Sequence, residues 1–223
     1  MRSRHVDRFN HDDEAADYDL DVQNEDDPIR AGYDALLDWV VERTGAGSGM
    51  RVLDLGAGTG NLSARLPAAC ELVCVDISSE MRRIGAAKLA SQDRVSWVSA
   101  DLIEYFERAG PKFDAIVSTY AIHHLMADEK TELFGRIWSS LAGGGRAVFG
   151  DLMFAHADAR AQQLAAYRAS GDASQVALAD DIEDEFFWDV AEALAQLREL
   201  GFSVEAQRFS ALSWGIAATR PGP

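Results

Sequence analysis

The sequence predicts an α/β fold built on a mostly parallel sheet with helices on both faces. Apolar runs of strand length alternate with helix-like segments over residues 50–151, which is the pattern of successive βαβ units. The first apolar run breaks into closely spaced glycines, Gly56-Ala57-Gly58-Thr59-Gly60, and such a turn lets backbone approach a ligand. Aspartates lie near the ends of the first three apolar runs, where parallel sheets bind their ligands.

The N-terminal part predicts an arm followed by a helix. Residues 1–27 are polar and acidic with few apolar anchors, which indicates a partly ordered lid or, alternatively, a disordered acidic tail. The next helix is expected to have Asp27 as its N-cap, Pro28 at its first position and Gly45 at its end. Its apolar stripe consists of Leu36, Leu37, Val40 and Val41.

The remaining elements follow in alternation. We expect strands near residues 50–55, 71–76, 94–99, 113–118 and 145–151. Helices are expected near residues 61–67, 79–90, 102–108 and 129–142. Residues 156–200 read as helical segments interrupted near Gly171-Asp172 and stopped by Gly201, and the stretches 202–209 and 212–219 read as two strands.

Length and composition narrow the class of protein. A chain of 223 residues suits one domain, and without an apolar run of about 18 residues or a signal peptide we expect a cytoplasmic protein. The formal net charge of −16 disfavours nucleic acid as a substrate or partner and favours small molecules. With few lysines and many acids, the surface also suits a high-salt cytoplasm. Cys70 and Cys74 are expected to be free thiols.

The glycine spacing distinguishes between cofactors. A dinucleotide fingerprint is G-x-G-x-x-G, whereas this chain has G-x-G-x-G with Asn61 at the third glycine position of that fingerprint. With Asp54 two places before Gly56, the segment resembles motif I of the class I S-adenosylmethionine-dependent methyltransferases. Asp76, twenty-two residues after Asp54, then stands where Rossmann-type sites bind ribose hydroxyls.

The resemblance extends over nearly the whole chain and is nearest to the YrrT-like group of small bacterial methyltransferases. It implies one domain over residues 1–223, seven strands with the last one antiparallel, an arm over the cofactor and an acceptor-side insertion at residues 152–190. It implies that Asp54 lies near the ammonium group, that Asp101 contacts the adenine amino group and that Tyr18 faces the sulfonium. The implied cofactor-binding residues are Tyr18, Asp54, Gly56, Ala57, Gly58, Asp76, Ile77, Met81, Asp101, Leu102 and Thr119.

Methyl transfer from a sulfonium is an in-line displacement that needs no covalent residue, so the catalytic residues stay open. His123 and His124, after the fourth strand, are the candidate bases, or they merely fix the turn; Asp151 and His156 are weaker candidates. His5 and His11 lie in the arm, and without a regular ligand spacing we expect no metal site. The cluster Phe186-Phe187-Trp188 is expected to be core rather than acceptor pocket.

The expected function is methyl transfer to a small molecule, with no membrane partner and a homodimer as one possible assembly. The turn Ser118-Thr119-Tyr120-Ala121 lacks the Asn/Asp-Pro-Pro-aromatic motif that serves a flipped base, which again disfavours nucleic acid. Two alternatives stay open: a non-catalytic sensor or scaffold that binds the same cofactor, and a nicotinamide-dependent oxidoreductase. The oxidoreductase requires a third glycine where this chain has Asn61.

Overall fold

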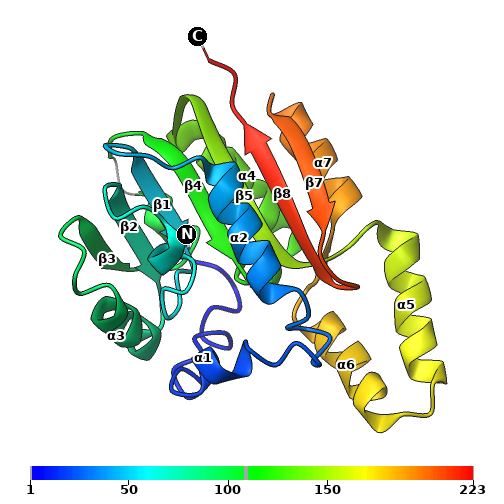
Figure 1. Cartoon of the computed structure of the whole chain (residues 1–223). Helices are drawn as coiled ribbons and strands as arrows, with labels where there is room; N and C mark the ends of the chain where they lie inside the picture. Colours follow the sequence, from blue (N-terminus) through cyan, green and yellow to red (C-terminus); the bar gives the residue numbers. More distant parts are fainter. Residues whose placement is uncertain (1, 108–109, 223) are drawn as a thin grey trace.

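The fold is a twisted sheet with helices on both faces (Figure 1), seen in a computed structural model that describes residues 2–107 and 110–222. The sheet order is β3-β2-β1-β4-β5-β8-β7, and the two-residue β6 pairs with β5 outside this path. Strands β1 to β5 run parallel, whereas β8 runs antiparallel to both β5 and β7. The predicted fold class is therefore confirmed, with β6 as an addition to the seven expected strands.

The strands agree closely with the sequence prediction. The first five expected strands all form, but β5 is longer than expected at both ends. The strands are β1 (Arg51–Leu55), β2 (Glu71–Asp76), β3 (Val95–Ser99), β4 (Phe113–Thr119), β5 (Leu141–Phe154), β6 (Trp188–Asp189), β7 (Ser203–Arg208) and β8 (Ser213–Thr219).

The helices depart further from the prediction. The α-helices are α1 (Tyr18–Asp21), α2 (Tyr33–Thr44), α3 (Ser79–Lys88), α4 (Ala127–Ser140), α5 (Ala157–Ala169), α6 (Ala173–Asp184) and α7 (Val190–Glu199). The described residues also form short 3-10 helices, which are η1 (Ser63–Arg65), η2 (Glu104–Glu107) and η3 (Ile122–His124).

The helices expected near residues 61–67 and 102–108 are wrong as α-helices. After the glycine loop the chain makes only η1, and Leu66 is already extended with ψ of 150° because the residue before a proline avoids the helical region. In the second segment only η2 forms, since Gly110 and Pro111 follow it closely; residue 108 lies outside the described residues.

The start of α2 also differs from the prediction. Asp27 is not the N-cap: its carboxylate accepts a hydrogen bond from the backbone N–H of Ile29 at 2.9 Å, which makes a separate turn. The helix begins only after Gly32, whose φ of 79° is a left-handed conformation. Its predicted end is confirmed, because Gly45 caps it with a φ of 59°.

Two apolar cores lie on opposite faces of the sheet. On one face α2 packs Leu36, Leu37 and Val40 against β4, β5 and β8 (Figure 1). On the other face α4 and α7 pack residues such as Leu133, Phe134 and Leu197. Helices therefore cover both faces of the sheet, which leaves the ends of the strands as the place for a ligand.

A pair of glycines lets α2 lie close to the sheet. Gly150 in β5 and Gly215 in β8 are direct neighbours in the antiparallel register. A Cβ on Gly150 would come within 2.9 Å of Leu36, and one on Gly215 within 2.4 Å of Trp39. The space above these two glycines is therefore filled by the side chains of Leu36 and Trp39 from α2.

Among the described residues, no helix combines the length and the apolar character that crossing a bilayer requires.

The close approach of Trp39 to Gly215 leads to a stability prediction. Gly215→Ala should lower the free energy of unfolding by about 1 to 3 kcal/mol, because the added methyl group overpacks the contact with Trp39. The matched control is Gly135→Ala in α4, where a Cβ meets no atom within 4 Å and the helix propensity improves by about 0.5 to 1 kcal/mol. Denaturant unfolding of both variants checks this, and equal stability of the two would contradict it.

Candidate active site

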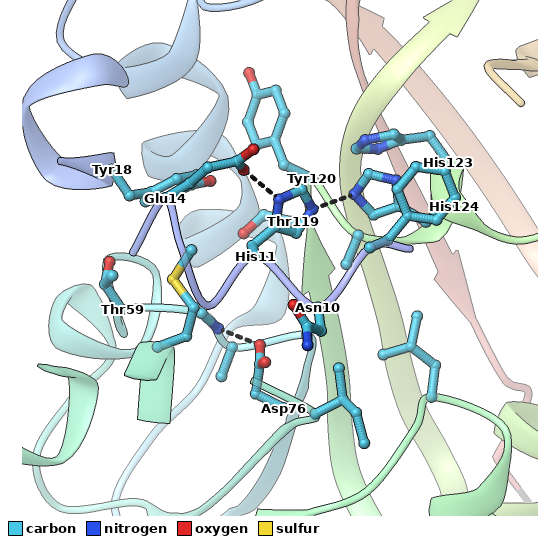
Figure 2. Close-up of a pocket in the computed structure, with 18 of the residues that line it drawn as sticks. Asn10, His11, Glu14, Tyr18, Thr59, Asp76, Thr119, Tyr120, His123 and His124 are labelled. Atoms are coloured by element: carbon cyan, nitrogen blue, oxygen red, sulfur yellow. Dashed lines mark hydrogen bonds and ion pairs between the residues drawn. The ribbon is translucent and has the colours of Figure 1, made fainter. Parts of the chain in front are cut away.

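A pocket of about 600 Å³ lies where the carboxyl ends of β1, β2 and β4 meet. The N-terminal arm, residues 2–27, forms much of its wall together with the glycine loop and the turn at η3 (Figure 2). Every predicted cofactor-binding residue except Asp54 lines this pocket, and so do His123 and His124. The lining members of the predicted set are Tyr18, Gly56, Ala57, Gly58, Asp76, Ile77, Met81, Asp101, Leu102 and Thr119.

The glycine loop has the backbone shape that only glycine adopts easily. Gly56 and Gly58 have φ values of 70° and 53°. A Cβ on Gly56 would lie 2.4 Å from the Cβ of Ala121, whereas a Cβ on Gly58 would meet no atom within 4 Å. Gly56 is therefore needed for packing against the turn after β4, and Gly58 leaves open space on the pocket side.

Asp76 ends β2 and has both carboxylate oxygens tied to backbone. Its Oδ2 accepts the N–H of Gly58 at 2.7 Å, and its Oδ1 accepts the N–H of Ser78 at 2.9 Å. Burial raises the pKa of this carboxyl group. Each oxygen keeps a second lone pair, so Asp76 can accept further hydrogen bonds from a ligand in the pocket.

Asp54 lies beneath the loop instead of on the pocket wall. Its side chain is fully buried, and its Oδ2 accepts a hydrogen bond from the Ser63 hydroxyl at 2.6 Å. Its Oδ1 is buried and has no hydrogen-bond partner among the described residues. Burial raises the pKa of Asp54 to about 7.

Asp101 is held by the arm. Its Oδ1 accepts the backbone N–H groups of Ser3, Ile103 and Glu104, and its Oδ2 accepts the Ser3 hydroxyl at 2.5 Å. The carboxylate thus joins residue 3 to the end of β3. The resemblance assigns Asp101 to the adenine amino group, and in this structure the same carboxylate also accepts hydrogen bonds from Ser3 of the arm.

The arm is bound at further points along its length. The Asp12 carboxylate accepts the Ser78 hydroxyl at 2.6 Å and the Glu80 N–H at 3.1 Å, so it caps the start of α3. Asp19 accepts the Thr59 hydroxyl at 2.6 Å and pairs with Lys88 at 2.8 Å. These contacts tie the arm to the glycine loop and to the helix after β2.

The turn at η3 brings the predicted histidines to the opposite side of the pocket from Asp76 (Figure 2). Nε2 of His124 lies 3.1 Å from Nε2 of His11, and the ring of Phe9 stacks on His124 with a centroid distance of 4.2 Å. Burial lowers the pKa of His124 well below its ordinary value. His124 is therefore a neutral imidazole covered by the arm.

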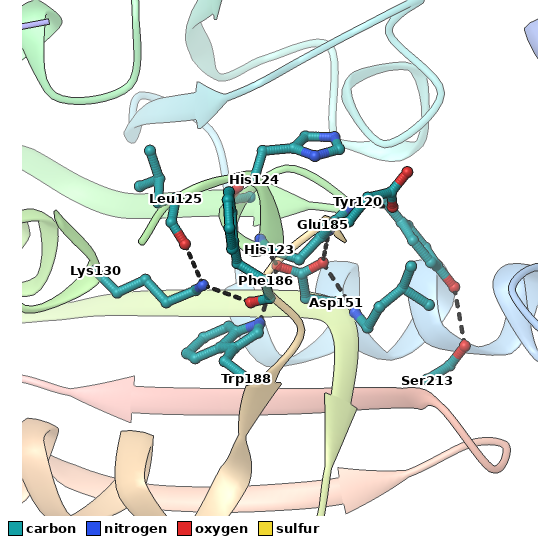
Figure 3. Close-up of polar contacts among 12 residues, drawn as sticks. Tyr120, His123, His124, Leu125, Lys130, Asp151, Glu185, Phe186, Trp188 and Ser213 are labelled. Atoms are coloured by element: carbon teal, nitrogen blue, oxygen red, sulfur yellow. Dashed lines mark hydrogen bonds and ion pairs between the residues drawn. The ribbon is translucent and has the colours of Figure 1, made fainter. Parts of the chain in front are cut away.

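His123 is fixed by Asp151 (Figure 3). Oδ1 of Asp151 lies 2.5 Å from Nδ1 of His123, and its Oδ2 accepts the backbone N–H of His123 at 2.9 Å. The carboxylate also accepts the Leu152 N–H at 2.8 Å and the indole N–H of Trp188 at 3.3 Å. Because the neighbours on this side are acceptors, Nδ1 of His123 carries a proton, and in the neutral imidazole the lone pair lies on Nε2.

Several pocket residues were missed by the sequence analysis. Tyr120 follows β4 with a φ of 50°, a conformation uncommon for non-glycine residues that often marks functional sites. Glu185 lies between α6 and β6, and its Oε2 is 3.7 Å from Nε2 of His123. Arg30 also lines the pocket and pairs with Asp21 at 2.7 Å. Their positions depend on loop conformations, for which the sequence carries no periodic signal.

The aromatic cluster at residues 186–188 is mainly core, as expected. Phe187 and Trp188 are buried and belong to the two apolar cores, one on each face of the sheet. Phe186 contacts the arm instead, with its ring 5.1 Å from that of His5.

The sequence matches known methyltransferases along most of its length. A family described as "Methyltransferase domain" matches residues 52–145. An uncharacterized methyltransferase of Geobacillus thermodenitrificans is 33% identical over 92% of this chain and 93% of its own length. Another from Bacillus licheniformis is 36% identical over 84% of each chain.

Solved structures share the fold at low sequence identity. Phosphoethanolamine N-methyltransferase 2 of Haemonchus contortus, solved with S-adenosyl-L-methionine, has a TM-score of 0.70 at 17% identity over 97% of this chain and 59% of that chain. The DhpI–SAH complex has a TM-score of 0.67 at 20% identity, covering 96% and 94% of the two chains.

Asp54 gives a pH prediction with a defined sign. The unfolded carboxyl group loses its proton near pH 4, whereas the folded one keeps it up to about pH 7, so the folded state binds more protons in between. The free energy of unfolding therefore falls as the pH rises through this range. Relative to Asp54→Asn, wild-type stability should drop by roughly 2 to 3 kcal/mol between about pH 5 and about pH 8.

Denaturant unfolding at both pH values measures this difference. The control is Asp93→Asn, since Asp93 is exposed. A wild-type pH slope that persists in Asp54→Asn would show that another group causes it.

Proposed function

The chain belongs to the class I S-adenosylmethionine-dependent methyltransferases, and on this premise we propose that it methylates a small molecule that is neutral or positively charged. The single observation that carries the proposal is the charge of the pocket wall. Seven carboxylates line the described pocket, and Arg30 is the only lysine or arginine there. The carboxylates are those of Asp13, Glu14, Asp17, Asp21, Asp76, Asp101 and Glu185.

The one cation is already neutralised. The Arg30 guanidinium lies 2.7 Å from Asp21 and above the ring of Tyr18, with the centroid at 5.5 Å. An acceptor with phosphate or several carboxylate groups would meet uncompensated negative charge in this pocket. This supports a neutral or cationic acceptor and argues against nucleic acid.

Three observations support the binding of the methyl donor in this pocket. Gly58 leaves open space at the loop, Asp76 presents two oxygens with spare lone pairs, and a buried oxygen of Asp54 lacks a partner beneath the loop. The volume of about 600 Å³ also lies within the usual range for cofactor sites. Bound S-adenosylmethionine supplies an electrophilic methyl group on a positively charged sulfur.

We assign the donor-side residues accordingly. Asp76 accepts the ribose hydroxyls, Asp101 accepts the adenine amino group, and the glycine loop gives the methionine part access to backbone. Asp54 reaches the ammonium group only through water, because it lies behind the pocket wall. Tyr18 faces the sulfonium with its ring. The further contacts in this assignment come from Ile77, Met81, Leu102 and Thr119.

The acceptor side is assigned to His123. Asp151 holds Nδ1, so the free Nε2 can take the proton that the accepting atom loses. Asp151 is a positioning residue in this proposal, because it acts through His123. His124 covers the acceptor pocket together with Phe9 and His11.

The arm and the segment 152–190 complete this pocket. Leu152 and Glu185, near the ends of that segment, both line it. Arg8 of the arm pairs with Asp184 at 2.9 Å, which joins the two segments. We propose that residues 1–27 act as a lid and that residues 152–190 determine the acceptor, within one domain of residues 1–223.

Incubation with S-adenosylmethionine labelled in its methyl group tests the acceptor class directly. Panels of amines, phenols, thiols and phosphorylated compounds are offered, and labelled products are identified by mass spectrometry. The proposal expects label in neutral or cationic small molecules. Label found only in nucleic acid, or only in phosphorylated acceptors, would overturn it.

Asp76→Asn should weaken S-adenosylmethionine binding by about 1 to 3 kcal/mol, because one acceptor of the ribose hydroxyls becomes a donor. Calorimetric titration of the donor measures the change. Glu80→Gln is the matched control, since the Glu80 side chain instead pairs with Arg83 at 2.8 Å. An affinity equal to that of wild type would remove Asp76 from the ribose contact.

His123→Asn should lower turnover by about 10²- to 10⁴-fold while donor affinity stays unchanged. The asparagine amide can still donate to Asp151, but no nitrogen remains to take a proton. His156→Gln is the control, because His156 caps α5 and lies outside the pocket. Turnover is measured with an acceptor found in the labelling experiment, and a wild-type rate in His123→Asn would exclude His123 as the base.

A further inference from the structure

We propose that the pocket also binds a divalent transition-metal ion, with His123, His124 and Glu185 as its protein ligands. One nitrogen or oxygen atom of each residue lies within 4.8 Å of the others. Nε2 of His123 and Oε2 of Glu185 are 3.7 Å apart, close to the spacing of two ligands around one ion. Two imidazoles and one glutamate are a ligand set of zinc sites that keep a fourth position open.

The first ligand is oriented before any ion arrives. Asp151 holds Nδ1 of His123 at 2.5 Å, which turns Nε2 toward Glu185 (Figure 3). Metal-binding histidines commonly donate their other ring N–H to a carboxylate, because this fixes the tautomer and the ring direction. Asp151 is buried and accepts three other N–H groups, so its own position is fixed.

The second ligand carries an unused nitrogen. Nδ1 of His124 is buried and has no hydrogen-bond partner among the described residues. A buried polar atom without a partner is unfavourable unless something else binds it.

The third ligand is free to take part. The Glu185 side chain is about one-third exposed (32%), and its Oε2 lies 3.7 Å from Nε2 of His123. Among the described residues, its carboxylate accepts no hydrogen bond that an ion would have to break. All three proposed ligands line the pocket, so an ion held by them would be accessible from the cavity.

The chemistry of the three proposed ligands indicates which metal ions the site would bind. Imidazole nitrogens suit Zn²⁺, Co²⁺ and Ni²⁺, whereas Mg²⁺ and Ca²⁺ prefer oxygen ligands throughout. The sequence hides this site, because two ligands are adjacent and the third lies about sixty residues later. An ion at Nε2 of His123 would occupy the lone pair that the proposed function assigns to the base, so the atom cannot serve both roles at once. The binding test below needs neither methyl donor nor acceptor.

The test is metal binding by the full chain without donor or acceptor. After treatment with a chelator, the protein is titrated with Zn²⁺ in a calorimeter, with excess Mg²⁺ present to saturate surface carboxylates. Co²⁺ is added in parallel to record the visible bands of a four-coordinate site. We expect one saturable Zn²⁺ per chain and an intense Co²⁺ spectrum.

Two variants decide the assignment. Glu185→Gln removes a charged ligand at a partly exposed position, and His124→Phe keeps a flat ring on Phe9 while removing both nitrogens. Each should weaken Zn²⁺ binding at least about tenfold, given that losing an outer partner alone costs 10- to 100-fold. The matched control, Glu183→Gln, changes an exposed carboxylate two residues away and should bind as wild type.

Thermal unfolding of each variant shows that it is folded before titration. Absence of saturable Zn²⁺ binding in the wild-type protein would overturn the proposal. So would wild-type affinity in both Glu185→Gln and His124→Phe. Because neither S-adenosylmethionine nor an acceptor is present, a failed methylation assay leaves this result unaffected.

Discussion

The hydrogen bonds collected by the Asp151 carboxylate are the constraint on which the acceptor side of this molecule depends. Four donors converge on two buried oxygens: the backbone and ring of His123, the backbone of Leu152 and the indole of Trp188. These groups belong to η3, β5 and β6, which have no common sequence motif. A buried carboxylate is tolerated only when it is paired and hydrogen-bonded, so losing one donor destabilises the whole arrangement. The direction of His123 therefore follows from the folding of β5 and β6 around one oxygen pair.

Across the pocket from His123, polar side chains hold the N-terminal arm in place. Its acidic residues are not spread at random: Asp12 caps α3, and Asp19 pairs with Lys88 and Thr59 beside the glycine loop. Ser3 donates to both carboxylate oxygens of Asp101, and its hydroxyl is the only hydrogen-bond partner of Oδ2 among the described residues. A segment with few apolar residues thus gains its order from polar contacts with the cofactor-binding edge of the sheet. The position of the arm is therefore coupled to Asp101, one of the carboxylates that we propose bind the methyl donor.

The strands of the sheet and the residues around the glycine loop could be predicted from the sequence, because both have regular sequence patterns. Apolar runs gave β1 to β4 nearly to the residue, and the glycine spacing with Asp76 located the pocket edge. The sequence prediction was wrong at positions where the conformation of a loop determines whether a helix forms or where it begins. Pro67 prevented the helix expected after the glycine loop, and Gly32 delayed the start of α2. The acceptor side was only partly readable, since Glu185 and Tyr120 enter the pocket through a left-handed backbone or an irregular connection.

The charge of the pocket limits how catalysis can work. Carboxylates from the arm, from β2 and from the loop before β6 line the cavity, so under the proposed function they stabilise positive charge on both the methyl donor and the acceptor. A methyl transfer moves positive charge from one side to the other, and groups that stabilise both positions equally lower the energy of the reactant and of the transition state together. Rate must then come from alignment and from removal of a proton on the acceptor side. Under the proposed function, Nε2 of His123, held in place by Asp151, takes up this proton and so makes the two sides different.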